Sequence, residues 1–134
     1  MTKTMTATGE FDVKLAPQPA SDKGQEAALG RMSLDKQFRG GLEATSVGEM
    51  LMVRTPTEGS AGYVALERVT GKLDGRSGSF VLQHNGIMNR NTPALTITVV
   101  PDSGTGELEG LNGSMTIEIT GGKHFYRFEY ELAR

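Results

Sequence analysis

The sequence predicts an all-β protein, folded as a sandwich or a barrel, on three observations. Apolar and polar residues alternate along short runs, which is the pattern of half-buried strands. Glycine occurs 18 times in 134 residues, nearly twice its average usage of about 7%. These glycines interrupt the alternating runs at short intervals, as tight turns do. About eight short antiparallel strands therefore account for the chain, and no segment has the pattern of a long helix.

The chain has the size of one common domain, so we expect a single domain over residues 1–134 with a core of its own. It has no cysteine, which excludes a disulfide framework and a thiolate metal site. The net charge is −2 and its charges are interspersed, so we expect no nucleic-acid partner. We expect no membrane association and a cytoplasmic location, because long apolar runs and the apolar core of a signal peptide are both lacking.

The first strand is predicted within residues 5–16, where apolar residues alternate with charged ones. Pro17 should end it, since proline cannot donate a ladder hydrogen bond. Residues 17–30 are polar and lack periodicity, which predicts a mobile loop with one helical turn at Gln25–Leu29. This loop is the candidate lid over an opening of the barrel.

Three strands are expected between residues 32 and 55. In the first, Lys36 interrupts an apolar phase set by Met32, Leu34 and Phe38. The other two, at 42–47 and 50–55, should be separated by a tight turn at Gly48-Glu49.

The most informative stretch is residues 62–86, which predict a β-hairpin turning at residues 75–78. Its alternation places Glu67 on one face with Tyr63, and His84 on one face with Leu82. Symmetry about the turn pairs residues whose numbers add to about 151, so Glu67 should lie directly opposite His84. A carboxylate and an imidazole would then share the interior.

The remaining strands are predicted at residues 94–101, 114–120 and 123–132, the last two joined by a turn at Gly121-Gly122. In the last strand, His124 and Tyr126 share the apolar face. The segment between the strands predicted at 94–101 and 114–120 is rich in glycine and contains Ser103 and Thr105.

Glu67 and His84 are the candidate catalytic residues. Burial would raise the pKa of Glu67 toward a range useful for proton transfer, and a neutral imidazole can act as a general base. The alternatives are that Glu67 faces outward, or is paired structurally to a tyrosine or an arginine. His84 would then be a hydrogen-bonded core residue.

The candidate ligand-binding residues fall into two groups. Tyr63, His124 and Tyr126 would line the barrel interior or its mouth, although His124 could instead cap the last hairpin. Ser103 and Thr105 could form a backbone nest for an anion, or a turn with hydroxyl-to-backbone hydrogen bonds. No histidine spacing suits a metal, so we expect neither a metal nor a cofactor.

Three segments together resemble a bacterial family of short, uncharacterised proteins placed with the allene oxide cyclase-like β-barrels. They read GYVALERVTGKLDGRSGSFVLQHNG, VVPDSGTGELEGLNG and HFYRFEY. The resemblance spans nearly the whole chain and implies a single eight-stranded antiparallel barrel. It implies no activity, because the catalytic pattern of the plant cyclases is not recognised here.

These observations favour a barrel that binds a small apolar or amphipathic ligand at an internal polar site. An isomerase or lyase that uses Glu67 with His84 is the first alternative. The second is a structural or assembly barrel without a ligand. Barrels of this kind often associate, so we expect a homo-oligomer in which the charged last strand could form the contact.

Overall fold

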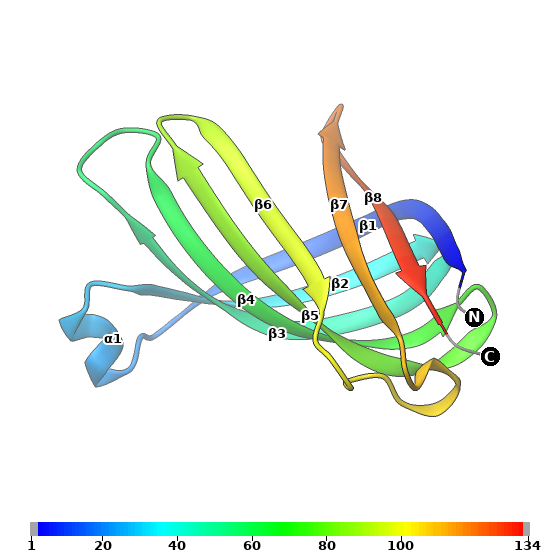
Figure 1. Ribbon diagram of the computed structural model, residues 1–134. Coiled ribbons are helices and arrows are strands. Elements are labelled where there is room, and N and C mark those ends of the chain that lie inside the picture. The colour runs from blue at the N-terminus through cyan, green and yellow to red at the C-terminus, as the bar shows by residue number, and fades with distance from the viewer. Residues whose placement is uncertain (1–2, 133–134) are drawn as a thin grey trace.

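In the computed structural model, which describes residues 3–132, eight antiparallel strands form a closed barrel (Figure 1). The strands follow chain order and β8 pairs with β1, so the predicted all-β class is confirmed as a barrel. A short helix, α1 (Asp22–Glu26), joins the first two strands, and a single 3-10 turn (Gly106–Leu108) precedes β7. The strands are β1 (Thr4–Gln18), β2 (Gly30–Gly40), β3 (Leu42–Arg54), β4 (Ala61–Leu73), β5 (Arg76–Asn89), β6 (Thr92–Val99), β7 (Asn112–Thr120) and β8 (Lys123–Glu131).

One end of the barrel is filled by aromatic side chains from the inward faces of the strands. Phe80 and Phe128 stack with ring centroids 5.7 Å apart, and Phe128 stacks in turn on Tyr130. Phe11 of β1 and Phe38 of β2 pack with ring centroids 5.5 Å apart. Phe80, Phe128 and Tyr130 are at most 2% exposed, so this end is a packed core. Burial of each such ring stabilises the fold by about 1.5–3 kcal/mol.

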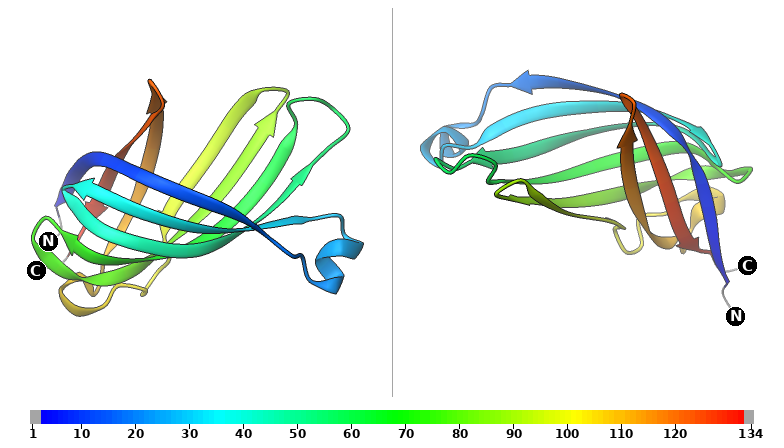
Figure 2. Two further views of the ribbon diagram at one scale, coloured as in Figure 1. Left: turned by 180° about the vertical axis from the view of Figure 1, so that it is seen from behind. Right: turned by 90° about the horizontal axis from the view of Figure 1, so that it is seen from above.

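The other end is open because the barrel is held weakly at one junction. β6 pairs with β7 through two residue pairs, Ile97 with Met115 and Thr98 with Ser114. Beyond this junction β6 and β7 diverge (Figures 1 and 2). Residues 50–54, 61–63, 86–89 and 92–95 of β3–β6 therefore form a flared part of the sheet, here called the wing.

The central hairpin turns earlier than predicted. Asp74 and Gly75 form the two-residue turn, both with positive φ (47° and 85°), as a type I′ hairpin requires. The Tyr130 hydroxyl donates a hydrogen bond to Asp74 and anchors this turn. The predicted turn at residues 75–78 is therefore wrong.

The register shifts with the turn. Glu67 lies opposite Leu82 and His84 lies opposite Ala65, so the predicted direct pairing of Glu67 with His84 is wrong. Because side chains alternate with a period of two, a displacement of two residues leaves both on the inward face. Their predicted common face is confirmed.

The turn predicted at Gly48-Glu49 is also wrong, because β3 runs unbroken through both residues. Gly48 pairs with Glu67, and a Cβ at position 48 would lie 2.1 Å from the Leu66 carbonyl oxygen. The glycine permits close approach of two backbones rather than a reversal of the chain. The two predicted strands are thus one.

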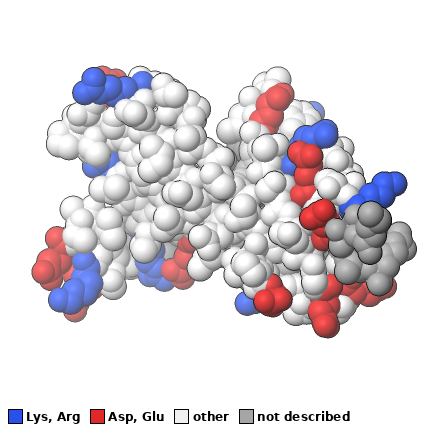
Figure 3. All heavy atoms as spheres, in the orientation of Figure 1, with Lys and Arg blue, Asp and Glu red and all other residues white. Residues whose placement is uncertain are grey.

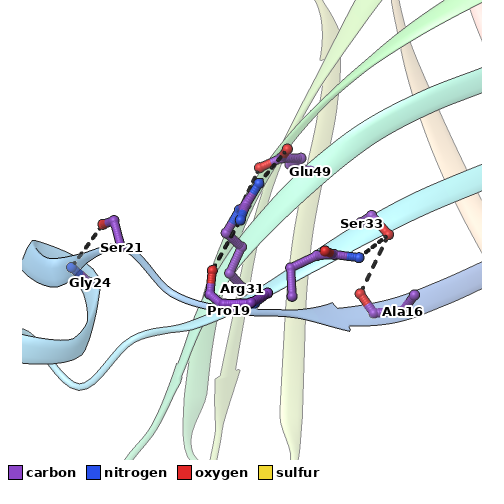
Figure 4. Close-up of polar contacts among 8 residues, drawn as sticks. Ala16, Pro19, Ser21, Gly24, Arg31, Ser33 and Glu49 are labelled. Carbon is purple, nitrogen blue, oxygen red and sulfur yellow. Dashed lines mark hydrogen bonds and ion pairs between the residues drawn. The ribbon is translucent and has the colours of Figure 1, made fainter.

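The connection between β1 and β2 is more ordered than its sequence predicts. β1 continues through Pro17, which pairs with Met32, and the predicted helical turn at Gln25–Leu29 begins earlier, as α1. Ser21 caps this helix by accepting a hydrogen bond from the Gly24 N–H at 3.1 Å, which fixes its start (Figure 4).

Arg31 secures the base of the same connection. Its guanidinium donates to both carboxylate oxygens of Glu49 at 2.8 and 2.9 Å, and to the Pro19 carbonyl at 3.0 Å (Figure 4). The contacts of Arg31 join β3 to the segment that leaves β1. None of the side chains of α1 is buried, so the helix itself projects from the barrel (Figure 1).

We expect limited trypsin digestion to cut first after Lys23. Its side chain is 92% exposed and its helix packs against no core, so the backbone can open locally at small cost. The first fragments should be identified by mass spectrometry. Earlier cleavage after Arg54, which precedes the loop between β3 and β4, or after Arg90, in the turn between β5 and β6, would contradict the predicted mobility of residues 17–30.

Candidate functional site

Four polar side chains from adjacent strands meet inside the barrel. They are Lys36 of β2, Ser46 of β3, Glu67 of β4 and His84 of β5, here called the buried quartet. Each occupies an inward position of its strand, and each is less than 9% exposed. Four neighbouring strands thus contribute one polar group each to a single spot on the inner wall.

Glu67 is the centre of the quartet. Its Oε1 accepts a hydrogen bond from Lys36 Nζ at 2.8 Å and contacts His84 Nε2 at 2.6 Å. Its Oε2 accepts a short hydrogen bond from the Ser46 hydroxyl. The Glu67 side chain is fully buried, so these three partners replace its entire hydration.

Burial raises the pKa of Glu67, but three favourable contacts outweigh it. The hydrogen bond to His84, the charge and hydrogen bond of Lys36, and the Ser46 hydrogen bond bring the pKa down to about 2. The carboxylate is therefore ionised at neutral pH. The expectation that burial would leave Glu67 with a pKa suited to proton transfer is wrong, and Glu67 acts as a fixed negative charge.

The ionised carboxylate sets the tautomer of His84. Glu67 can only accept, so His84 Nε2 carries the hydrogen of their contact. In the neutral ring, Nδ1 then holds a lone pair. A carboxylate that orients an imidazole in this way leaves the second nitrogen able to accept a hydrogen bond or a proton.

Sequence reasoning missed Lys36 and Ser46. Lys36 has the same strand phase as the buried Leu34 and Phe38, so its position carried the signal that it points inward. Its ammonium group lies 4.9 Å from the centroid of the Phe11 ring, a cation–π contact that helps a cation stay inside. The signal for this ion pair was thus an inward lysine, Lys36, together with an inward glutamate, Glu67, on a nearby strand.

A cavity of about 670 Å³ opens on the wing. Its lining includes inward residues of all four wing strands, so it lies on the same face as the quartet. The face of the molecule seen in Figure 3 is hollowed between the tips of β3–β6 and the β7–β8 hairpin, and its middle is free of charged side chains. Lining residues on inward positions include Met52, Tyr63, Gly86, Met88 and Leu95. None of residues 17–30, the predicted lid, lines this cavity.

Tyr63 lines the cavity, and along β4 the inward residue Ala65 lies between it and Glu67 of the quartet. Its ring lies against Gly86, where an added Cβ would be 2.1 Å from Tyr63 Cε1, so the glycine provides the space for the ring. Burial raises the pKa of Tyr63, and the charge of Glu67 raises it further, which places the phenol within the field of the quartet. The Tyr63 hydroxyl makes no hydrogen bond with the described residues.

The other predicted ligand-binding residues lie elsewhere. His124 is half-buried with its ring 5.1 Å from that of Phe11, and it does not line the wing cavity. The Tyr126 hydroxyl is occupied, because it accepts from the Leu42 N–H at 2.9 Å and donates to the Arg39 carbonyl at 2.8 Å. Tyr126 thus fastens β8 to the turn between β2 and β3.

Ser103 and Thr105 hold their loop against β5. The Ser103 hydroxyl accepts from the Val81 N–H, and the Thr105 hydroxyl accepts from the Ser79 N–H, both at 3.0 Å. These contacts match the alternative interpretation of the segment, a turn with hydroxyl-to-backbone hydrogen bonds. Within residues 3–132, no three histidines, aspartates or glutamates lie close enough together to hold a metal.

Comparison with known proteins places this barrel in a family. Residues 7–130 match the family model described as "Protein of unknown function (DUF3224)". The chain belongs to the DUF3224 family. The resemblance to a family of unknown function with a barrel fold is thereby confirmed.

A crystal structure of another DUF3224 protein, from Shewanella oneidensis MR-1 and of unknown function, is similar along its whole length. The identity is 54% and the TM-score 0.91, over 98% of this chain and 99% of that one. No curated protein matches this DUF3224 chain. Among residues 3–132, no helix has the length and apolarity that a membrane span requires.

We expect Tyr126→Phe to lower the free energy of unfolding by about 1–3 kcal/mol, because it leaves the buried Leu42 N–H without its acceptor. Denaturant unfolding measures this change. Tyr63→Phe is the matched control, since it removes a hydroxyl without a protein partner and should cost less. Equal losses in the two variants would contradict the fastening role of Tyr126.

We expect Glu67→Gln to destabilise the barrel by about 3–5 kcal/mol at pH 7, because Lys36 then stays buried without its counter-charge. The effect should depend on pH. Because the pKa of Glu67 lies near 2 in the folded protein and near 4.5 without these contacts, its contribution is complete above pH 4.5 and is lost as the pH falls toward 2.

Denaturant unfolding at several pH values tests this dependence. The difference between wild type and Glu67→Gln should shrink on acidification. Glu49→Gln, which removes an exposed partner of Arg31, should have a much smaller effect at pH 7. A difference between wild type and Glu67→Gln that stays constant from pH 7 to pH 2 would contradict the ionised, paired state of Glu67.

Proposed function

We propose that this DUF3224 barrel binds a small apolar or amphipathic molecule in the wing cavity. One observation carries the proposal: an open cavity of about 670 Å³ lies on the same inward face as the buried quartet. Ligand cavities commonly measure about 300–1,000 Å³ and combine an apolar lining with a few polar groups. The wing cavity has both properties.

The exposure of the lining supports the same function. Met88 and Leu95 occupy inward positions, yet they are 39% and 43% exposed. On the same strands, Leu82 and Ile97 are almost fully buried in the packed end. At the wing, apolar side chains on the inward face are therefore exposed to solvent, whereas at the packed end the corresponding side chains are buried. Met52 and Met88 add flexible side chains that adapt to ligands of different shape.

Two alternatives have specific support. An isomerase or lyase is supported by the carboxylate-oriented imidazole of His84, with Glu67 as a fixed charge rather than the base. A structural or assembly role is supported by apolar residues on the outward face of β3 and β4. Leu51, Val64 and Leu66 are 44–54% exposed there, which would suit self-association. A homo-oligomer and a cytoplasmic location remain predictions.

Native mass spectrometry of freshly purified protein should reveal a co-purified molecule.

For a direct test we choose N-phenyl-1-naphthylamine, an uncharged apolar dye that fluoresces when it leaves water. We expect Leu95→Asp to weaken its binding at least tenfold, because a charge would enter the apolar lining.

Leu66→Asp is the matched control, since it places the same charge at a residue of similar exposure on the outward face. It should bind the dye as wild type does. Unchanged binding by Leu95→Asp, or a complete lack of binding by wild type, would refute the wing cavity as the ligand site.

A further inference from the structure

We infer that β7 binds an extended peptide segment along its edge at residues 116–120, so that the peptide adds a strand to the barrel. The peptide presents a basic side chain opposite Glu118 and apolar side chains beside Ile117 and Ile119. This surface differs from the proposed ligand site, because none of residues 116–120 lines the wing cavity.

The first step concerns the backbone of β7. Residues 116–120 all pair with β8 on one side, whereas among the described residues β7 pairs with β6 through Ser114 and Met115 alone. Alternate residues of such a strand direct their N–H and C=O groups away from β8. Within residues 3–132, no backbone hydrogen bond outside the β7–β8 ladder reaches residues 116–120, so they form a free edge. The group that complements a free edge is another extended backbone.

The second step is access to this free edge. β6 turns away from β7 before it reaches residues 116–120, and the surface is hollowed between the two (Figures 1 and 3). The facing edge of β6 carries Pro93, which cannot donate a ladder hydrogen bond. The free edge of β7 contains no proline and reads TIEIT, which suits an extended strand. β7 is therefore the better of the two edges for an added strand.

The third step concerns the inward face of the free edge. Ile117 and Ile119 follow the buried Met115 on this face. Ile117 packs partly against the core, but Ile119 is 66% exposed, more than any other large apolar side chain among the described residues. An added strand with apolar residues on its inward face would cover Ile119, and burial of that apolar surface favours binding.

The fourth step is the charge of Glu118 on the outward face. Glu118 is exposed and accepts a hydrogen bond from the Thr120 hydroxyl at 3.0 Å, but it forms no ion pair with the described residues. The cation nearest to it along the sheet, Arg127, is paired with Glu129 at 3.7 Å. Glu118 is therefore the charge at this edge that an incoming strand can neutralise.

A groove of about 550 Å³ continues from Glu118 across the outward faces of β7, β8 and β1. Phe125 lies opposite Glu118 on one side and opposite Glu10 on the other, so its ring lies between two carboxylates. Lys123 lies 3.9 Å from Glu10, which leaves Glu118 for a partner. Carboxylates beside an aromatic ring favour a cation, and a long basic side chain opposite Glu118 can extend into this groove.

The same charge disfavours a second copy of the chain as the occupant. If two free edges paired antiparallel over all five residues, the two Glu118 side chains would lie directly opposite each other. Like charges in that position destabilise a sheet, whereas opposite charges stabilise it. The partner that fits is a segment of another protein in which a basic residue stands between apolar ones.

The experiment titrates ¹⁵N-labelled protein with two synthetic peptides, acetyl-TVKVT-amide and acetyl-TVEVT-amide. In antiparallel pairing over residues 116–120, the central residue of each peptide lies opposite Glu118. At low ionic strength we expect the lysine peptide to bind about fivefold more tightly, because the cross-strand charge pair is attractive with lysine and repulsive with glutamate. The amide NMR resonances of residues 116–120 should shift, and those of residues 92–96 of β6 should not.

Three controls isolate the contacts. The lysine peptide with N-methyl groups on its three central residues should not bind, because its backbone can no longer donate to the edge. Glu118→Lys should reverse the preference between the two peptides. Glu43→Lys makes the same change of charge at an exposed position of β3 and should keep the preference. The two peptides on wild type decide the question even if a variant does not fold.

Equal affinities of the lysine and glutamate peptides, or unchanged binding after N-methylation, would overturn the inference. A lack of binding at millimolar peptide, or shifts at residues 92–96 in place of 116–120, would do the same. Shifts at residues 116–120 that depend on protein concentration without peptide would assign the edge to a second copy and overturn the peptide as occupant. None of these outcomes bears on the wing cavity, which N-phenyl-1-naphthylamine tests separately.

Discussion

The ion pair of Lys36 with Glu67 is the interaction on which the rest of this barrel depends. Each buried charge loses several kcal/mol of hydration, and the pair persists because Ser46 and His84 satisfy the rest of the carboxylate. These partners come from four consecutive strands, so the pair also requires one register across β2–β5. It marks the boundary where the packed aromatic end stops and the open wing begins.

How far the sequence predicts the site can be argued from its central hairpin. The common face of Glu67 and His84 was predictable, because an alternation of period two survives an error of two residues in register. Their exact pairing was not, since Asp74-Gly75 competes with several other glycine-containing turns nearby. Gly48 misled for a related reason: the same residue permits a turn and a close approach of two strands, and only the neighbouring strand distinguishes them.

The parts that could not be predicted depend on contacts distant in the sequence. Lys36 interrupts an apolar run, and nothing in the neighbouring sequence shows that it forms an ion pair with Glu67, 31 positions later. Tyr126 was expected in a ligand site because its strand phase is inward, yet Leu42 and Arg39 occupy its hydroxyl. The wing cavity itself exists because β6 and β7 part after two residue pairs, which no alternation within either strand reveals.

The short junction between β6 and β7 has a mechanical consequence. Every residue of β4 pairs with β5, whereas among the described residues Ile97 and Thr98 are the residues of β6 that pair with β7. A force that pushes the strands of the barrel outward therefore acts mainly on this junction. The other junctions each have at least eight residue pairs among the described residues, so we expect this one to have the greatest elastic compliance. For the ligand that we propose, the available volume would depend on how far this junction opens as well as on the shape of the cavity.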